Sequence, residues 1–261
     1  MSELVKLDRN GPIAVLTMCK PERRNAFCPE MRRTLTQHLL DLAVDRDCRA
    51  IVLTGAQGHF SAGADLSRVD VAAPRPSAIE TRQNMLEVHG LIRALFCGPK
   101  PVVAAVEGLA FGGGFSIALA CDWIVASRTA RFGTAFARLG LIGDLGIYYT
   151  LKARVGLVAA RRMLSLGEQI AGTDAVTLGI ADQVSEPGEA LAQAMIEAGK
   201  YAQSAPLTIA YTKAAYGNGI ENLEDALRAE LDYLPLVIES EDFQNALTAF
   251  KAKTQPVFTG A

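Results

Sequence analysis

The 261-residue sequence has no long apolar run, no excess of charge of either sign and no cysteine pair at redox or metal-binding spacing. Because no stretch approaches the roughly 18 consecutive apolar residues of a membrane-spanning helix, we expect no membrane span. Lys plus Arg number 26 and Asp plus Glu number 28, so the chain has no general attraction for nucleic acid or an anionic membrane.

The cysteines give no sign of a metal centre or a redox cofactor. Five cysteines occur, an odd number, and none belongs to a CxxC pair, which is typical of reduced thiols in a cytoplasm-like compartment. The first residues, MSELVKLDRNG, contain no apolar signal core. We therefore expect a cytoplasmic protein with no metal and no permanently bound cofactor.

Hydrophobic residues make up 50% of the chain, which is enough for a sizeable core. Apolar runs that end at glycine, and apolar residues at helical spacing, predict a first part in which strand, glycine turn and helix recur. The expected strands are 5–7, 13–18, 50–55, 101–106 and 122–126, and the expected helices are 29–42 and 77–96. Beyond 188 we expect helices at 190–203, 207–216, 222–234 and 241–251, with Pro206 and Pro235 placed where helices end.

Two glycine-containing turns are the most informative motifs. HFSAGADL at 59–66 follows the predicted strand 50–55, and EGLAFGGG at 107–114 lies between a strand and a helix. Successive glycines let a ligand approach backbone N–H groups without obstruction by a Cβ atom. The second turn suits an anion or a developing oxyanion, although close strand–helix packing without a ligand explains that turn alone equally well. The GxGxxG pattern of dinucleotide-binding folds is absent from it.

Together the two turns resemble the crotonase (enoyl-CoA hydratase/isomerase) superfamily. FSAGADL resembles its first oxyanion-hole segment, GLAFGGG followed by CDWIVAS resembles its second, and KPERRNAF resembles its CoA-binding segment. The resemblance implies an α/β fold, a crotonase-like spiral of ββα units with a C-terminal helical trimerisation region. We therefore expect residues 1–200 to form the core with the acyl-CoA site, and 201–261 to assemble a homotrimer or a dimer of trimers.

The same resemblance implies that the backbone N–H groups of Ala64 and Gly113 hold the thioester oxygen of an acyl-CoA. Two preorganised donors stabilise enolate charge, and loss of one such donor typically reduces the rate by about 10²–10³. Coenzyme A enters only as part of the substrate. Substrate and CoA contacts are expected from Arg23, Arg24, Ala26, Ala62, Asp65, Leu66, Gly112, Ser116, Phe136 and Leu139. For the arginines, a solvated surface position is the alternative, and for Ser116 it is a hydrogen bond to its own helix.

The chain departs from the family pattern at both glutamates of a standard hydratase. Ser116 and Phe136 stand at the two positions where family hydratases carry these carboxylates. Hydration needs groups that position water, remove its proton and protonate carbon. Ordinary enoyl-CoA hydration is therefore disfavoured.

One acid remains in the matching region, Asp144 in the segment LGLIGDLG at 139–146. It aligns with an aspartate used in dienoyl-CoA isomerases, epoxyphenylacetyl-CoA isomerases and 4-chlorobenzoyl-CoA dehalogenase. The alternative is an N-cap for the helix that follows. Burial beside Phe136, Leu139 and Leu141 is expected to raise its pKa and strengthen it as a base.

His89, on the predicted helix 77–96, matches the position of a histidine base in the dehalogenase branch. A structural role is the alternative. The favoured activity is therefore double-bond or ring isomerisation of an acyl-CoA by Asp144. The rival is hydrolysis or dehalogenation of an acyl- or aryl-CoA, with Asp144 as nucleophile and His89 as base. A catalytically weak CoA-ester binding protein is the alternative from another class.

Overall fold

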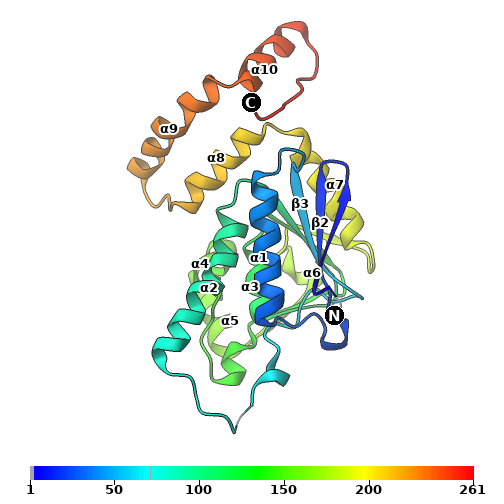
Figure 1. Cartoon of the computed structure of the whole chain (residues 1–261), viewed down its shortest axis with the longest axis vertical. Helices are drawn as coiled ribbons and strands as arrows, with labels where there is room; N and C mark the ends of the chain where they lie inside the picture. The colour runs from blue at the N-terminus through cyan, green and yellow to red at the C-terminus, as the bar shows by residue number, and fades with distance from the viewer. Residues whose placement is uncertain (1–2, 71) are drawn as a thin grey trace.

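The computed structural model describes residues 3–70 and 72–261 and has an α/β core with a protruding set of C-terminal helices (Figure 1). A six-stranded sheet lies at the centre, in the order β1-β2-β3-β4-β6-β9. Its strands are β1 (Val5–Asn10), β2 (Ile13–Met18), β3 (Ala50–Gly55), β4 (Val102–Val106), β6 (Trp123–Ser127) and β9 (Gln183–Ser185). β1 pairs with β2 as the expected hairpin, and the other neighbours are parallel.

Both faces of this sheet are covered, as the apolar strand sequences predict. The helices α1 (Pro29–Val44), α2 (Ala78–Phe96) and α3 (Gly113–Leu119) cover one face, and α7 (Ala190–Gln203) covers the other. Successive side chains of a strand point to opposite faces. In β3, Ile51 and Leu53 accordingly join the larger core, whereas Val52 packs on the alanines of α7.

A second, three-stranded sheet carries part of the candidate site. It consists of β5 (Leu109–Phe111), β7 (Arg131–Gly133) and β8 (Gln169–Ala171). These elements were not predicted, because three residues are too few to display a period of two. The remaining short helices are η1 (Pro21–Arg23), η2 (Leu66–Arg68), η3 (Ala135–Leu139), α4 (Ile147–Val155), α5 (Leu157–Leu166) and α6 (Gly172–Ala175).

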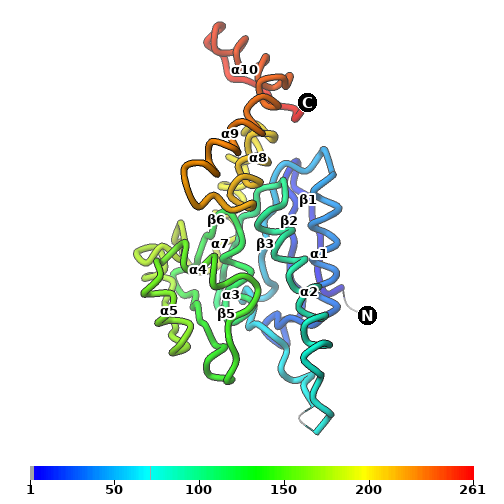
Figure 2. The backbone as a smooth tube through the Cα atoms, turned by 90° about the vertical axis from the view of Figure 1, so that its left-hand side faces the viewer, coloured from blue at the N-terminus to red at the C-terminus, as the bar shows by residue number. Residues whose placement is uncertain are grey.

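The chain ends in three helices, α8 (Pro206–Gly217), α9 (Leu223–Ile238) and α10 (Glu241–Ala252). Both ribbon views show α9 and α10 extending away from the core (Figures 1 and 2). The expectation that Pro235 ends a helix is wrong, because α9 continues through it to Ile238. Pro235 has no N–H group to donate to the Leu231 carbonyl. Leu231 is 77% exposed, so water can satisfy that oxygen.

None of the helices in the described parts of the chain combines the length and the apolar character that crossing a membrane requires. The predicted α/β organisation, with its strands, glycine turns and helical C-terminal part, is confirmed.

Candidate active site

The two glycine turns lie side by side at the carboxyl ends of β3 and β4. Ser61 of the first turn donates its N–H to the Leu109 carbonyl (2.8 Å) and accepts one from the Phe111 N–H (2.9 Å). A Cβ atom at Gly114 would lie 2.6 Å from the Ser61 carbonyl oxygen, which is closer than real contacts allow. Glycine is therefore required at position 114 for the two turns to meet.

Gly114→Ala should destabilise the fold by about 2–3 kcal/mol or more, because its methyl group would collide with the backbone of Ser61. Gly113→Ala is the matched control. Its Cβ atom would meet only the flexible end of the Leu145 side chain, at 2.9 Å. Urea denaturation of both variants measures the difference. Equal stability of the two would contradict the close approach described here.

The N–H groups of Ala64 and Gly113 are the two expected oxyanion donors, and the described residues supply a backbone acceptor for neither. These two N–H groups lie close together. A Cβ atom at Gly63, the residue before Ala64, would lie 3.4 Å from the Gly113 nitrogen. Ala64 is exposed, so a ligand can reach its side of the turn. Two neighbouring free backbone donors can hold one developing negative oxygen.

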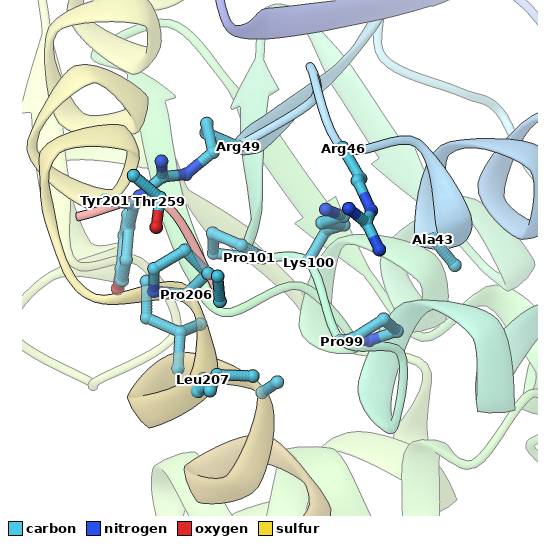
Figure 3. A pocket seen from close by; sticks show the side chains of 14 residues that line it. Ala43, Arg46, Arg49, Pro99, Lys100, Pro101, Tyr201, Pro206, Leu207 and Thr259 are labelled. Atoms are coloured by element: carbon cyan, nitrogen blue, oxygen red, sulfur yellow. The ribbon is translucent and has the colours of Figure 1, made fainter. Parts of the chain in front are cut away.

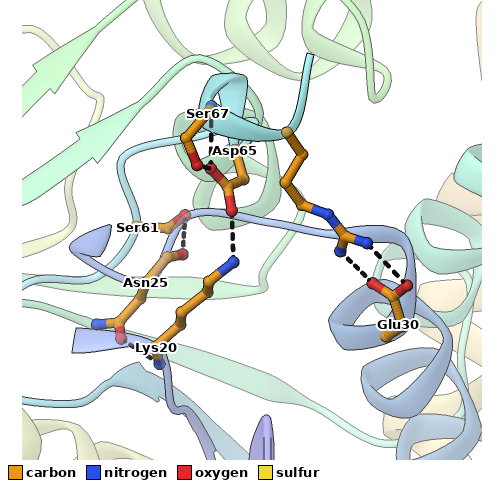
Figure 4. Close-up of polar contacts among 7 residues, drawn as sticks. Lys20, Asn25, Glu30, Ser61, Asp65 and Ser67 are labelled. Atoms are coloured by element: carbon orange, nitrogen blue, oxygen red, sulfur yellow. Dashed lines mark hydrogen bonds and ion pairs between the residues drawn. The ribbon is translucent and has the colours of Figure 1, made fainter. Parts of the chain in front are cut away.

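The segment 20–26 is fastened to the first turn by Asn25, which sequence reasoning missed as an organising residue (Figure 4). Its fully buried side chain accepts the Lys20 N–H (2.9 Å) and donates to the carbonyls of Ala56 (2.8 Å) and His59 (2.7 Å). The sequence signal that could have pointed to Asn25 is an asparagine in a turn. Asparagine tolerates a positive φ angle, such as the 55° found here.

The expected CoA-contact residues of this segment surround the turn. Arg24 accepts the Ala62 N–H through its carbonyl (2.9 Å), so its side chain starts beside the oxyanion turn. Arg23 and Arg24 are exposed, and neither has an ion-pair partner within the described chain. Ala26 is buried beneath them, and Leu66 is half-exposed.

Asp65 and Ser116 have internal partners. The buried Asp65 carboxylate pairs with Lys20 and accepts the Ser67 hydroxyl (2.6 Å) (Figure 4). The hydrogen bonds from Lys20 and Ser67 lower the pKa of Asp65 to about 2. The fully buried Ser116 donates its hydroxyl to the Gly112 carbonyl (3.3 Å), which is the helix-backbone alternative. The structure thus gives Asp65 a role in holding the turn.

Asp144 is brought to the second turn by its neighbour Leu145. The Leu145 Cδ1 atom lies 2.9 Å from where a Gly113 Cβ would be, and Leu145 is 9% exposed. Its φ of 56° is uncommon for a leucine. Sequence reasoning missed Leu145, because no periodicity marks a single buried residue between glycines.

The N-cap interpretation of Asp144 is wrong. The N-cap residue of α4 is Gly146, and no side chain bonds to that end of the helix. The Oδ1 atom of Asp144 is instead buried with no hydrogen-bond partner among the described residues. A buried carboxylate oxygen without a partner is unfavourable for stability and is typical of a functional group.

Burial raises the pKa of the Asp144 carboxyl, as predicted, while its own backbone N–H and His89 oppose the rise. The half-buried His89 lies on α2. Of the residues expected to lie beside it, Leu139 and Leu141 are themselves 52% and 57% exposed. Phe136 is buried, with its Cε1 atom 3.9 Å from a Cβ position at Gly112.

Comparison with known proteins identifies the family. The family model described as Enoyl-CoA hydratase/isomerase matches residues 8–261. The chain belongs to the enoyl-CoA hydratase/isomerase family. It is an enzyme of the crotonase superfamily, whose substrates are CoA thioesters.

Relatives within this family carry out different reactions. The chain is 35% identical to 1,2-epoxyphenylacetyl-CoA isomerase of Escherichia coli K12, with 100% of both chains covered. It is 32% identical to the short-chain-enoyl-CoA hydratase of Clostridium acetobutylicum, with 95% of each covered. A crystal structure of an enoyl-CoA hydratase from Polaromonas sp. JS666 superposes with a TM-score of 0.90 at 31% identity, covering 97% of this chain and 99% of that one. The crotonase-like fold is thereby confirmed, and the reaction depends on the side chains.

Proposed function

We propose that this enzyme isomerises an acyl-CoA, moving a double bond or rearranging a ring through an enolate. Asp144 would remove a proton near the thioester and return it to another atom. The observation that carries the proposal is the buried Oδ1 atom of Asp144, which has no hydrogen-bond partner among the described residues and lies next to Leu145, the residue packed against Gly113. A carboxylate with a raised pKa is a stronger base at neutral pH.

The N–H groups of Ala64 and Gly113 would hold the enolate oxygen, since both donors are preorganised and free. Arg23 and Arg24 would bind the CoA phosphates, because a guanidinium suits phosphate and both side chains reach solvent beside the turn. The substrate pocket would be lined by Ala62, Gly112, Phe136 and Leu139. Hydration is disfavoured, because Ser116 and Phe136 offer no carboxylate where the hydratases have one.

A panel of enoyl-, dienoyl- and aryl-CoA thioesters, assayed side by side, tests this proposal. We expect isomerisation of at least one thioester and negligible hydration of crotonyl-CoA. Crotonyl-CoA turnover on the order of 10² s⁻¹ or more would show that water is activated without the two glutamates. A folded enzyme that binds several acyl-CoAs by calorimetry but converts none would favour the CoA-ester binding protein.

A second candidate function rests on the electrostatic effect of His89, whose charge lowers the pKa of Asp144. Asp144 would attack a halogenated aryl carbon and displace the halide to form an aryl ester, or attack the acyl carbon and displace the CoA thiolate to form an anhydride. Water activated by His89 would then hydrolyse the adduct and release the carboxylate of Asp144. His89→Gln distinguishes the two mechanisms. Under the nucleophilic mechanism this variant accumulates an adduct on Asp144, visible as added mass, whereas proton shuttling leaves the protein mass unchanged.

We also propose that 201–261 assembles a homotrimer or a dimer of trimers around the 1–200 core. No residue of α9 is buried in the single chain. Leu223, Leu227, Leu231 and Leu234 recur at helical spacing on it and are 41–77% exposed. A helix with an uncovered apolar face needs a partner.

The described cysteines are all free, in keeping with a reducing cytoplasmic location.

Light scattering at micromolar concentration should therefore give three or six times the mass of the chain. Replacing Leu227 and Leu231 by Gln should shift the protein towards a smaller species, because the apolar contact is lost. A wild-type protein that is monomeric at this concentration would refute the assembly.

A further inference from the structure

A cavity of about 260 Å³ lies where β3 and β4 begin, far from the candidate active site (Figure 3). The two glycine turns follow the opposite ends of these strands, at Gly55 and Val106. Strands of this length span roughly 17 Å, so the cavity is separate from the oxyanion turns. It opens where the core meets α8 and the last residues of the chain.

The cavity combines apolar walls with basic side chains. Pro99, Pro101, Pro206, Leu207 and Ile209 supply apolar surface. Arg46, Arg49 and Lys100 also line it, with Arg46 and Lys100 on one side and Arg49 on the other in Figure 3. An uncharged apolar ligand would offer these cations no anionic partner.

Carboxylates do not neutralise these cations directly. Arg49 donates to the carbonyls of Phe258 (2.8 Å) and Ser204 (2.9 Å), and Lys100 donates to the Asp45 carbonyl (2.9 Å). Within 3–70 and 72–261, neither they nor Arg46 has a carboxylate within 4.0 Å.

The nearby acids do not change this balance. The Asp45 carboxylate pairs with Arg9, whereas Lys100 bonds to the backbone carbonyl of Asp45. Asp47 in the same loop is exposed. The Ala261 oxygen accepts N–H groups at the start of α10, from Glu241 and Asp242. Burial lowers the pKa of the half-buried Lys100, as expected of a cation without close neutralisation.

We infer that this cavity binds a small organic anion, a carboxylate or phosphate group carried on a short apolar body. The anionic group would lie between Arg46 and Lys100, and the apolar body would lie against Pro101, Pro206 and Leu207. At about 30 Å³ for each water-sized group, the cavity holds roughly eight or nine non-hydrogen atoms. Hexanoate has this size and serves as the probe.

Calorimetry of the full chain tests the inference with hexanoate, hexanol and inorganic phosphate. We expect saturable hexanoate binding with a dissociation constant on the order of 1 mM or below, and at least tenfold weaker binding of hexanol and of inorganic phosphate. Hydrogen exchange should slow at 206–210 when hexanoate is bound. Hexanol binding as tight as hexanoate, or no saturable binding, overturns the inference. Phosphate binding as tight as hexanoate overturns the role of the apolar wall.

Charge-matched variants locate the site. Arg46→Gln with Lys100→Gln should weaken hexanoate binding at least tenfold. Arg131→Gln with Arg161→Gln removes two exposed arginines elsewhere and should change it less than twofold. If the first pair does not fold, the exposed Arg46→Gln alone should weaken binding at least threefold. Unchanged binding in Arg46→Gln, or equal losses in both pairs, overturns the inference.

Discussion

Asp144→Asn should reduce isomerase turnover by about 10²–10⁴, the usual contribution of a general base, without loss of stability. Asparagine keeps the size of the side chain but cannot take up a proton. It also removes a buried charge whose Oδ1 atom has no hydrogen-bond partner among the described residues. We therefore expect a variant that is equally stable or more stable, by on the order of 1 kcal/mol at neutral pH.

The pH dependence of this stability difference has a defined sign. Burial raises the pKa of Asp144 above its model-peptide value of 3.8, so the folded state binds this proton more tightly than the unfolded state. The contribution of Asp144 to stability therefore falls as pH rises above about 4. The advantage of Asp144→Asn should be present at pH 7 and should shrink as pH approaches 4.

Turnover and melting temperature, measured on the same preparations at several pH values, check this prediction. Asp174→Asn is the control, because it changes an exposed aspartate in the same way. Asp144→Asn with full turnover would make Asp144 structural. A variant that loses both activity and several degrees of melting temperature would point to a structural role that its contacts do not reveal.

Lys213→Met should destabilise the protein by about 3 kcal/mol, the lower end for a buried pair, because it leaves the partly buried Asp122 carboxylate, whose side chain is 22% exposed, without its ion-pair partner. Lys213 on α8 is 7% exposed, and its ammonium group bonds to the Leu95 carbonyl (3.0 Å) and pairs with Asp122. Asp122 in turn accepts the N–H of Val102 at the start of β4 (2.7 Å). The pair therefore joins the C-terminal helices to the central sheet.

Urea denaturation measures this effect, with Lys6→Met as the matched control. Lys6 pairs with Asp8 at the surface, where the two side chains are 56% and 50% exposed, so its loss should have little effect on stability. Adding Asp122→Asn to Lys213→Met should recover part of the stability, since the uncompensated charge is removed. Equal losses in Lys213→Met and Lys6→Met would contradict a stabilising role of the Lys213–Asp122 pair.

The elements with long, repetitive patterns could be predicted from the sequence. The strands β2, β3 and β4 are buried apolar runs, and α1 and α2 place an apolar residue on each successive turn. The two glycine turns were also predictable, because steric access to a backbone depends on the residue type itself. The expectation that these turns come together is confirmed by the hydrogen bonds of Ser61.

Features that depend on contacts between distant segments could not be predicted. The sequence around Asp144 fits an N-cap as well as a catalytic acid, and only the position of Gly146 at the start of α4 decides against the cap. The left-handed Leu145 and the buried Asn25 depend on partners in other segments of the chain. Pro235 led to a wrong prediction of the end of α9. The rule that proline ends a helix rests on the lost hydrogen bond and does not consider a carbonyl that water can reach.

Leu145 makes two opposing contributions to the stability of the loop that carries Asp144. A leucine with this backbone costs about 1–2 kcal/mol, and burying its side chain against Gly113 returns about 1.5–3 kcal/mol. Leu145→Gly would relax the backbone but would also release the carboxylate from the oxyanion turn. At this position the burial of the side chain offsets the cost of the backbone, so Asp144 is held in place at little net cost in stability.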